Sequence, residues 1–264
     1  MTLNNNVIWI TGASSGIGKG LALELSKKHN CKLILSSRRK EELEAVKQQC
    51  KHPNQVAIVP FDLTHYGNMN TVVEKALKCF GTIDVLINNG GISQRSLIIE
   101  TSIEVDKKLM EIDYLGTISL SKALLPYFIK KQNGHFVTVT SLMGKFSSPY
   151  RSAYCGVKHA LHGFFDALRM EHQKDQIKVT MICPGFVNTN VARNALTGDG
   201  SQQNSQDEAT QNGLTVETFS KKMITAIERE KFEVYIGKKE VLGVYLKRFF
   251  PKLLHKFVIK SQVR

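Results

Sequence analysis

Short apolar stretches alternate along the chain with longer segments in which apolar and polar residues recur at helical spacing. The apolar stretches predict strands at residues 7–11, 32–37, 56–60, 85–88, 135–140, 178–183 and 234–236. The segments between them predict helices, most clearly at residues 40–50, 69–80 and 153–173. Strands and helices in alternation form a parallel sheet covered on both faces. We therefore expect an α/β fold, a single-domain Rossmann-like doubly wound sheet of about seven parallel strands.

The length and composition of the chain fit one domain with a sizeable core. It has 264 residues, of which 42% are hydrophobic, and only six prolines, as is typical of a globular domain. The composition changes at residues 190–213, which are rich in Asn, Gln, Ser, Thr and Gly. This segment is either a mobile surface loop or a lid over a substrate. We place the domain at residues 1–239 and the C-terminal tail at residues 240–264.

A glycine-rich turn follows the first predicted strand. It reads Thr-Gly-Ala-Ser-Ser-Gly-Ile-Gly over residues 11–18 and opens a helical pattern. Glycines let the backbone turn tightly and approach a diphosphate, and the start of a helix offers free N–H groups and a positive dipole end. The turn therefore predicts a phosphate-binding site formed by Gly12, Ser14, Ser15, Gly16, Ile17 and Gly18.

A serine, a tyrosine and a lysine form a second candidate site. Tyr154 and Lys158 lie one helical turn apart, and Ser141 ends a predicted strand thirteen residues before the tyrosine. A free phenol has a pKa of about 10 and exchanges protons slowly near neutrality. A nearby ammonium favours the phenolate, and a serine hydroxyl can orient a carbonyl oxygen. Beside a dinucleotide site, this set indicates hydride transfer between a carbonyl and an alcohol, with Tyr154 as the acid/base.

The two motifs, in this order, resemble the short-chain dehydrogenase/reductase family up to about residue 190. The resemblance implies a cofactor-binding catalytic domain over residues 1–239, in which residues 190–213 close over the substrate. It also implies further residues that contact the cofactor, namely Asp62, Leu63, Asn89, Tyr154, Lys158, Pro184, Gly185, Val187 and Thr189.

The end of the second predicted strand bears on the choice between NAD and NADP. An acid there would bond the ribose 2′-hydroxyl of NAD and repel the 2′-phosphate of NADP. Ser37 stands at that place and Arg38 follows it, and a guanidinium is well shaped for a phosphate dianion. We predict NADP(H) as the cofactor. The alternative is that these residues only begin a solvated basic helix.

Asp113 departs from the pattern that the resemblance implies. Members of the family commonly carry an Asn at this place, where it holds a water that links the lysine to solvent. Aspartate has no amide donor, and its charge near Lys158 would change the effect of the lysine on Tyr154. A relay through a water bonded to Asp113 stays open. We expect a slower reaction or a shifted pH dependence.

Several segments resemble one branch of the family, the membrane-associated dehydrogenase/reductase 7B-like branch. They are residues 122–126, 151–154, 158–160 and 194–201. The resemblance implies an apolar or lipid-like substrate. The alternative function is an NADPH-binding regulatory or scaffold protein with weak catalysis, which only Asp113 favours.

Much of the charge lies in the tail. Lys and Arg number 36 against 23 Asp and Glu, a net charge of +13, and residues 238–264 hold eight basic residues and one acid. Apolar and basic residues of the tail recur at helical spacing, and Pro251 would divide the helix in two. The tail therefore either binds an anionic membrane surface or packs on the core or on a second subunit of a homo-oligomer.

Other features narrow the class of protein. The chain lacks the aromatic-rich basic platform of a nucleic-acid binder. Its five cysteines are scattered, so we expect reduced thiols and no metal site. We also expect neither a membrane-spanning helix nor a signal peptide, because no apolar run is long enough and the first residues are polar. The expected location is the cytoplasmic side, peripheral on an intracellular membrane.

Overall fold

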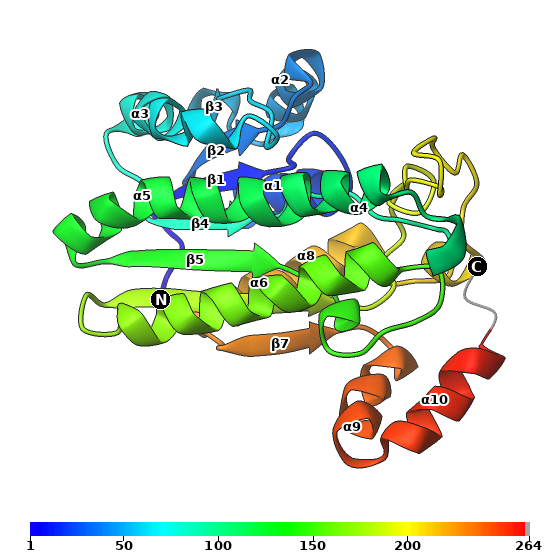
Figure 1. Ribbon diagram of the computed structural model, residues 1–264. Coiled ribbons are helices and arrows are strands. Elements are labelled where there is room, and N and C mark those ends of the chain that lie inside the picture. The colour runs from blue at the N-terminus through cyan, green and yellow to red at the C-terminus, as the bar shows by residue number, and fades with distance from the viewer. Residues whose placement is uncertain (262–264) are drawn as a thin grey trace.

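A computed structural model describes residues 1–261 of the chain. Its centre is one sheet with the strand order β3-β2-β1-β4-β5-β6-β7, in which every pair is parallel (Figure 1). The strands are β1 (Val7–Thr11), β2 (Lys32–Ser36), β3 (Val56–Ile58), β4 (Val85–Asn88), β5 (Gly134–Val139), β6 (Ile177–Pro184) and β7 (Glu233–Ile236). The predicted doubly wound sheet is confirmed.

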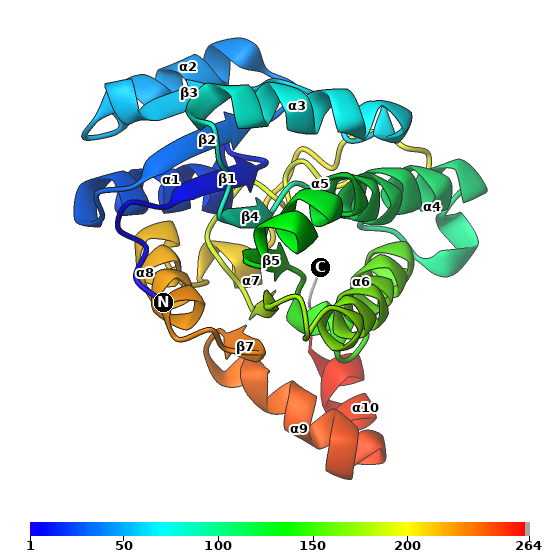
Figure 2. The same ribbon diagram turned by 90° about the vertical axis from the view of Figure 1, so that its left-hand side faces the viewer.

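Helices cover both faces of the sheet. One face carries α1 (Gly16–Lys28), α2 (Lys40–Gln49) and α8 (Val216–Glu228), and the other carries α3 (Met69–Phe80), α5 (Thr117–Lys131) and α6 (Ser152–Glu171) (Figure 2). Successive side chains of a strand point to opposite faces. Ile8 and Ile10 of β1 accordingly join the first core and Val7 and Trp9 the second. Burial on both faces explains why the strands read as continuous apolar runs.

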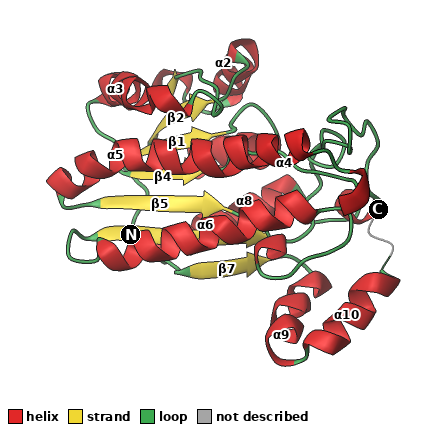
Figure 3. Cartoon of the chain, viewed as in Figure 1, coloured by secondary structure: helices red, strands yellow, loops and turns green. Residues whose placement is uncertain are grey.

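The remaining elements are short and lie mostly beyond the carboxyl ends of the strands, where the loops gather (Figure 3). They are η1 (Pro53–Gln55), η2 (Tyr66–Asn68), η3 (Ile98–Glu100), α4 (Ile103–Leu109), η4 (Met110–Gly116), η5 (Leu142–Gly144), α7 (Glu208–Gln211) and η6 (Lys239–Val241). The chain turns from β1 to β2 on one side and later to β4 on the other. Ligands of such sheets bind in the crevice that this reversal opens.

The tail forms two helices, α9 (Leu242–Phe249) and α10 (Pro251–Lys260). Pro251 begins the second helix, as the sequence predicted, because its missing N–H is not needed at a helix start. Leu254 is buried in a cluster with Leu142 and Phe146, so one side of the tail packs on the domain. Residues 262–264 of the predicted tail lie outside the described residues. Within residues 1–261, no helix has the length and apolar character needed to cross a membrane.

Candidate active site

The glycine-rich turn after β1 forms a cradle that only glycine allows. Gly12 has φ of +64°, and a methyl group on it would lie 2.7 Å from the Cα of Gly90. A methyl group on Gly18 would lie 2.4 Å from the carbonyl oxygen of Gly12. α1 begins at Gly16 without a side-chain cap from Ser15, so the N–H groups of its first turn stay available to an anion. The turn therefore fits the diphosphate of a dinucleotide.

Asn89 holds this cradle against β4. Its side-chain amide donates to the carbonyl oxygens of Thr11 (3.0 Å) and Gly12 (3.3 Å). In return, the Thr11 hydroxyl oxygen accepts from the backbone N–H groups of Asn89 and Gly90, both at 3.0 Å. These bonds give Asn89 a structural task, and its contact with a cofactor stays a prediction.

The end of β2 brings a basic residue to the cradle, but it is Arg39 that makes the contact. Its guanidinium donates to the hydroxyl of Ser14 at 3.1 Å and pairs with Glu42 at 2.7 Å. Arg38 is exposed, and Ser37 bonds the backbone of Arg39. The sequence analysis missed Arg39, although the consecutive arginines were a signal. Either guanidinium can reach an anion in front of Ser14.

Asp62 and Leu63 lie beyond β3, next to the same crevice. The Asp62 carboxylate accepts from the N–H of Thr64 at 2.9 Å, which shapes the turn. The backbone of Leu63 lies against Gly116, where a methyl group would be 2.5 Å from its carbonyl oxygen. The packing of this turn on η4 places both residues at the edge of the crevice.

The loop after β6 is held by a residue of the tail. The N–H of Phe186 donates to the Glu240 carboxylate at 3.0 Å, and the N–H of Gly185 donates to the carbonyl of Ile236 at 2.9 Å. Further along the loop, Thr189 lies 3.5 Å from the position of a methyl group on Gly16. Pro184, Gly185, Val187 and Thr189 thus share the crevice with the phosphate cradle. The sequence analysis missed Glu240, whose signal was its place as the lone acid of a basic segment.

Ser141 and Lys158 are brought together by close packing of a turn on α6. Ser141 follows β5, and its hydroxyl accepts from the N–H of Met143 at 3.1 Å, which begins η5. A methyl group on Gly144 would lie 2.9 Å from the carbonyl oxygen of Lys158. On α6, the Lys158 ammonium lies 5.4 Å from the ring centre of Tyr154. The three predicted catalytic residues therefore share the region where β5 meets α6.

Asp113 forms a buried ion pair with Lys158. Its Oδ2 lies 3.1 Å from the Lys158 Nζ, in a geometry that is that of a charge contact and not of a directed hydrogen bond. Oδ1 accepts from the N–H of Ile92 at 2.7 Å. The residue lies in η4, a π-helical turn between α4 and α5, and such turns are frequent at functional sites. Gly91 leaves the room, because a methyl group there would lie 2.7 Å from Oδ2.

The ion pair sets the charge at the site. Burial raises the pKa of the Asp113 carboxyl, although Lys158 and the N–H of Ile92 oppose the rise. Burial acts to lower the pKa of Lys158, but the attraction of Asp113 and Tyr154 outweighs it, and the pKa is raised. Lys158 is therefore an ammonium at neutral pH, and a carboxylate beside it opposes its effect on Tyr154.

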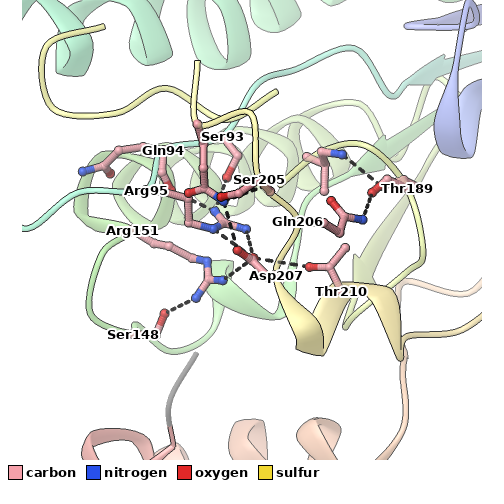
Figure 4. Close-up of polar contacts among 12 residues, drawn as sticks. Ser93, Gln94, Arg95, Ser148, Arg151, Thr189, Ser205, Gln206, Asp207 and Thr210 are labelled. Atoms are coloured by element: carbon pink, nitrogen blue, oxygen red, sulfur yellow. Dashed lines mark hydrogen bonds and ion pairs between the residues drawn. The ribbon is translucent and has the colours of Figure 1, made fainter. Parts of the chain in front are cut away.

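Residues 190–213 are tied to the domain by a buried ion triad. The guanidinium groups of Arg95 and Arg151 both point toward the carboxylate of Asp207 (Figure 4), at 2.8 and 3.2 Å. The side chain of Asp207 is fully buried. Burial acts to raise its pKa, but the two arginines hold that pKa below its usual value. The N–H of Leu196 also donates to the carbonyl of Ser93 at 2.8 Å. The segment thus lies where a lid would have to lie, and that role stays a prediction.

Gln94 links the same region to the start of α6. Its side-chain oxygen accepts from the N–H of Ala153 at 3.1 Å, one residue before Tyr154. Its amide group donates to the hydroxyl of Thr101 at 2.9 Å. Because Gln94 is fully buried, these bonds fix the first turn of α6. The sequence contains no pattern that predicts this role.

A buried cluster next to the site has potential metal ligands but does not form a metal centre. Cys183 faces the Nε2 of His162 at 3.7 Å, whereas Glu233 faces its Nδ1 at 3.2 Å. One ion cannot use both nitrogens of one ring. Lys145 pairs with Glu233 at 2.6 Å, and burial raises the pKa of Cys183 to about 12. We assign no metal to these residues.

The largest cavity that the structure describes is not the catalytic crevice. It has a volume of about 780 Å³ and lies on the outer side of α6, between η3 and the loop before that helix. Leu97, Pro149 and His159 line it, whereas Ser141, Tyr154 and Lys158 do not. The site is defined by the convergence of catalytic groups and the glycine cradle.

The chain belongs to the short-chain dehydrogenase family, whose family model matches residues 6–199. Dehydrogenase/reductase SDR family member 7 of Homo sapiens is 41% identical over 256 residues, covering 94% of this chain and 75% of that protein. SDR family protein 7-like of Anopheles gambiae is 38% identical over 268 residues, covering 98% and 84%. SDR family member 7B of Bos taurus is 38% identical over 264 residues, covering 97% and 81%. The expected branch is thereby confirmed.

Solved structures show the same fold. A short chain dehydrogenase/reductase from Burkholderia phymatum in complex with NAD matches with a TM-score of 0.85 at 20% identity, over 96% of both chains. A short-chain dehydrogenase from Streptomyces avermitilis matches with a TM-score of 0.81 at 24% identity, over 97% of this chain and 98% of the other. Fold and family together define a hydride-transfer oxidoreductase that uses a nicotinamide cofactor.

Proposed function

We propose that the protein is an NADPH-dependent oxidoreductase of CH–OH groups that reduces the carbonyl of an apolar or lipid-like substrate, or oxidises the corresponding alcohol. The observation that carries the proposal is the meeting of three groups at one end of the sheet. They are the glycine cradle after β1, the Ser141 turn, and Tyr154 with Lys158 on α6. Bound NADPH supplies the hydride to the carbonyl carbon.

The chain's own residues supply orientation and the proton. Ser141 donates a hydrogen bond to the carbonyl oxygen, which develops negative charge as the reaction proceeds. Tyr154 gives its phenolic proton to that oxygen, so that the alcohol forms and a phenolate stays on the enzyme. The Lys158 ammonium, 5.4 Å from the ring centre, stabilises the phenolate until solvent returns a proton.

The proposed preference for NADPH rests on Ser37, Arg38 and Arg39. No acid stands at the end of β2 to meet a ribose hydroxyl. The contact of Arg39 with Ser14 brings one guanidinium to the cradle, and Arg38 is exposed beside it. A 2′-phosphate would meet two positive charges there.

The proposed apolar substrate rests on the surroundings of Tyr154. The ring packs in a cluster with Val105, Leu109, Val157 and Leu196, the last of which comes from the 190–213 segment. An apolar wall favours an apolar group next to the reacting carbonyl. Such substrates collect in lipid, which agrees with a place on the cytoplasmic side of an intracellular membrane.

The experiment is turnover of NADPH against ketones and aldehydes, both water-soluble and lipid-derived. We expect oxidation of NADPH with the lipid-derived carbonyls and its loss in Tyr154→Phe, which removes the proton and keeps the ring. NADPH binding by Tyr154→Phe should stay close to that of the wild type. More than a few per cent of the wild-type rate in this variant would refute the role of Tyr154 as acid.

A second candidate function is that of an NADPH-binding regulatory or scaffold protein with weak catalysis. The observation that favours it is the 3.1 Å pair between Asp113 and Lys158, which diverts the charge that should activate Tyr154. Tight NADPH binding without turnover of any carbonyl in the panel would support this candidate.

A further inference from the structure

The two helices of the tail form a unit that is attached to the domain by one side. Leu254 is buried in a cluster with Leu142, Phe146 and Cys183. Gly243 lies close to Phe146, because a methyl group there would lie 2.7 Å from that ring. Leu142 and Phe146 follow the catalytic Ser141 in the chain. α9 and α10 are therefore held in place next to the catalytic turn.

The opposite side of this unit is apolar and uncovered. Seven of the sixteen large hydrophobic side chains that are exposed in the described structure lie within residues 242–259. They are Leu242, Tyr245, Phe249, Phe250, Leu253, Phe257 and Ile259. Scattered exposed hydrophobics are ordinary, but a concentration on two neighbouring helices marks an interaction surface. We call these seven side chains the tail surface.

Cations flank the tail surface. Lys252, Lys256 and Lys260 recur every fourth residue along α10 and are exposed, as are Lys247 and Arg248 on α9. Lys252 and Lys256 each stand directly before an aromatic or aliphatic member of the surface, Leu253 and Phe257. Residues 241–261 contain no acid, and within the described chain none of these five cations has an ion-pair partner. The cations are therefore available to an anionic partner.

We propose that the tail surface docks in the plane of an anionic lipid membrane. A helix with an apolar face and a cationic edge lies at the level of the lipid headgroups, with its apolar side chains among the acyl chains. A second copy of this chain suits the surface less well, because it would bring the same five cations into the contact and carries a net charge of +13. An anionic bilayer supplies both the apolar depth and the negative charge.

Docking by this surface has a consequence for the site. The tail helices lie beyond the end of β7, on the side to which the strands point (Figure 1). They pack on the turn after Ser141 and, through Glu240, on the loop after β6. The membrane would thus hold the catalytic end of the sheet near the lipid, from which an apolar substrate comes; this last step rests on the proposed function.

The test is flotation of the full chain with two kinds of vesicle, phosphatidylcholine alone and phosphatidylcholine mixed with phosphatidylserine. We expect binding to the mixed vesicles that weakens as salt is raised. The triple variant Lys252→Gln, Lys256→Gln, Lys260→Gln should bind about a hundredfold more weakly, because each basic residue near the surface contributes about fivefold. Phe249→Ser with Phe257→Ser should also weaken binding, and both are exposed, so the fold is spared.

The matched control is Lys51→Gln, Lys75→Gln, Lys78→Gln. These lysines are exposed, and the variant makes the same change in net charge at the opposite edge of the sheet. It should bind vesicles as the wild type does. Equal binding to both kinds of vesicle, or an equal loss in the control, would overturn the proposal.

Two further outcomes are distinguished. A dimer in solution that Phe249→Ser with Phe257→Ser converts to a monomer, without vesicle binding by the wild type, would assign the surface to a second copy and overturn the proposal. Tyr154→Phe should lose turnover and keep vesicle binding. Failure of the proposed reaction and failure of docking are thus observed separately.

Discussion

Replacing Asp113 by Asn removes one charge from the catalytic site and leaves its shape nearly intact. The side chain is fully buried, so no solvent screens its contact with Lys158. The amide oxygen can still accept from the N–H of Ile92, as Oδ1 does at 2.7 Å. The variant therefore isolates the effect of the carboxylate on the reaction.

The magnitude follows from two distances. At an effective dielectric constant of about 20, the ammonium 5.4 Å from the Tyr154 ring centre favours the phenolate by about 3 kcal/mol. The Asp113 Oδ2 lies 3.1 Å from that ammonium, so it lies at most 8.5 Å (5.4 + 3.1) from the ring centre. At that distance the carboxylate disfavours the phenolate by about 2 kcal/mol. More than half of the effect of the lysine is cancelled.

The assay is the pH dependence of kcat/KM for alcohol oxidation, in which the phenolate acts as the base. The rate rises with pH as the phenolate forms, and Asp113→Asn should move the midpoint of that rise to lower pH by more than about one unit, since one unit corresponds to about 1.4 kcal/mol. Glu111→Gln is the control, because it removes a partly exposed carboxylate two residues earlier in η4. Its profile should match that of the wild type.

The reasoning has a clear point of failure. An unchanged midpoint in Asp113→Asn would show that the carboxyl is already neutral in the working enzyme, because burial raises its pKa. A shift to higher pH would show that the carboxylate assists the phenolate and does not oppose it. Either result would refute the charge argument while leaving Tyr154 as the acid/base.

Three further predictions follow from the other parts of the site. Calorimetry should show NADPH binding about ten- to a hundredfold tighter than NADH, and Arg38→Asp with Arg39→Asp should invert the preference, because a charge-assisted phosphate contact is worth about 1.5–3 kcal/mol; equal affinities in the wild type would contradict it. Asp207→Asn should leave two buried guanidinium groups without a charge partner, at a cost of about 3 kcal/mol, and should speed limited proteolysis within residues 190–213. Because the pKa of Asp207 is lowered in the fold, its contribution to stability should be complete above about pH 4 and be lost as pH falls through the lower folded value. Glu240→Ala should weaken NADPH binding about tenfold by releasing the N–H of Phe186, whereas Glu240→Gln, which keeps an acceptor, should lose less.

The sequence by itself determined the architecture and the principal chemical groups of this protein. Apolar runs such as that of β1 are buried on both faces of the sheet, so their positions and the parallel topology could be predicted from composition alone. The glycine turn and the Tyr154–Lys158 spacing are local, and local spacing survives folding unchanged. Even the departure at Asp113 was visible as one residue type at one place.

Only the tertiary structure decided which distant residues meet. Nothing along the chain places Asp207 between Arg95 and Arg151, or Glu240 beneath Phe186, because these contacts depend on how loops from different strands pack. The tail shows the same limit. Its helical spacing predicted two alternatives, membrane contact or packing, whereas the fold buries Leu254 and leaves Phe249 and Phe257 exposed. Periodicity defines the faces of a helix, but the neighbouring elements determine which face is covered.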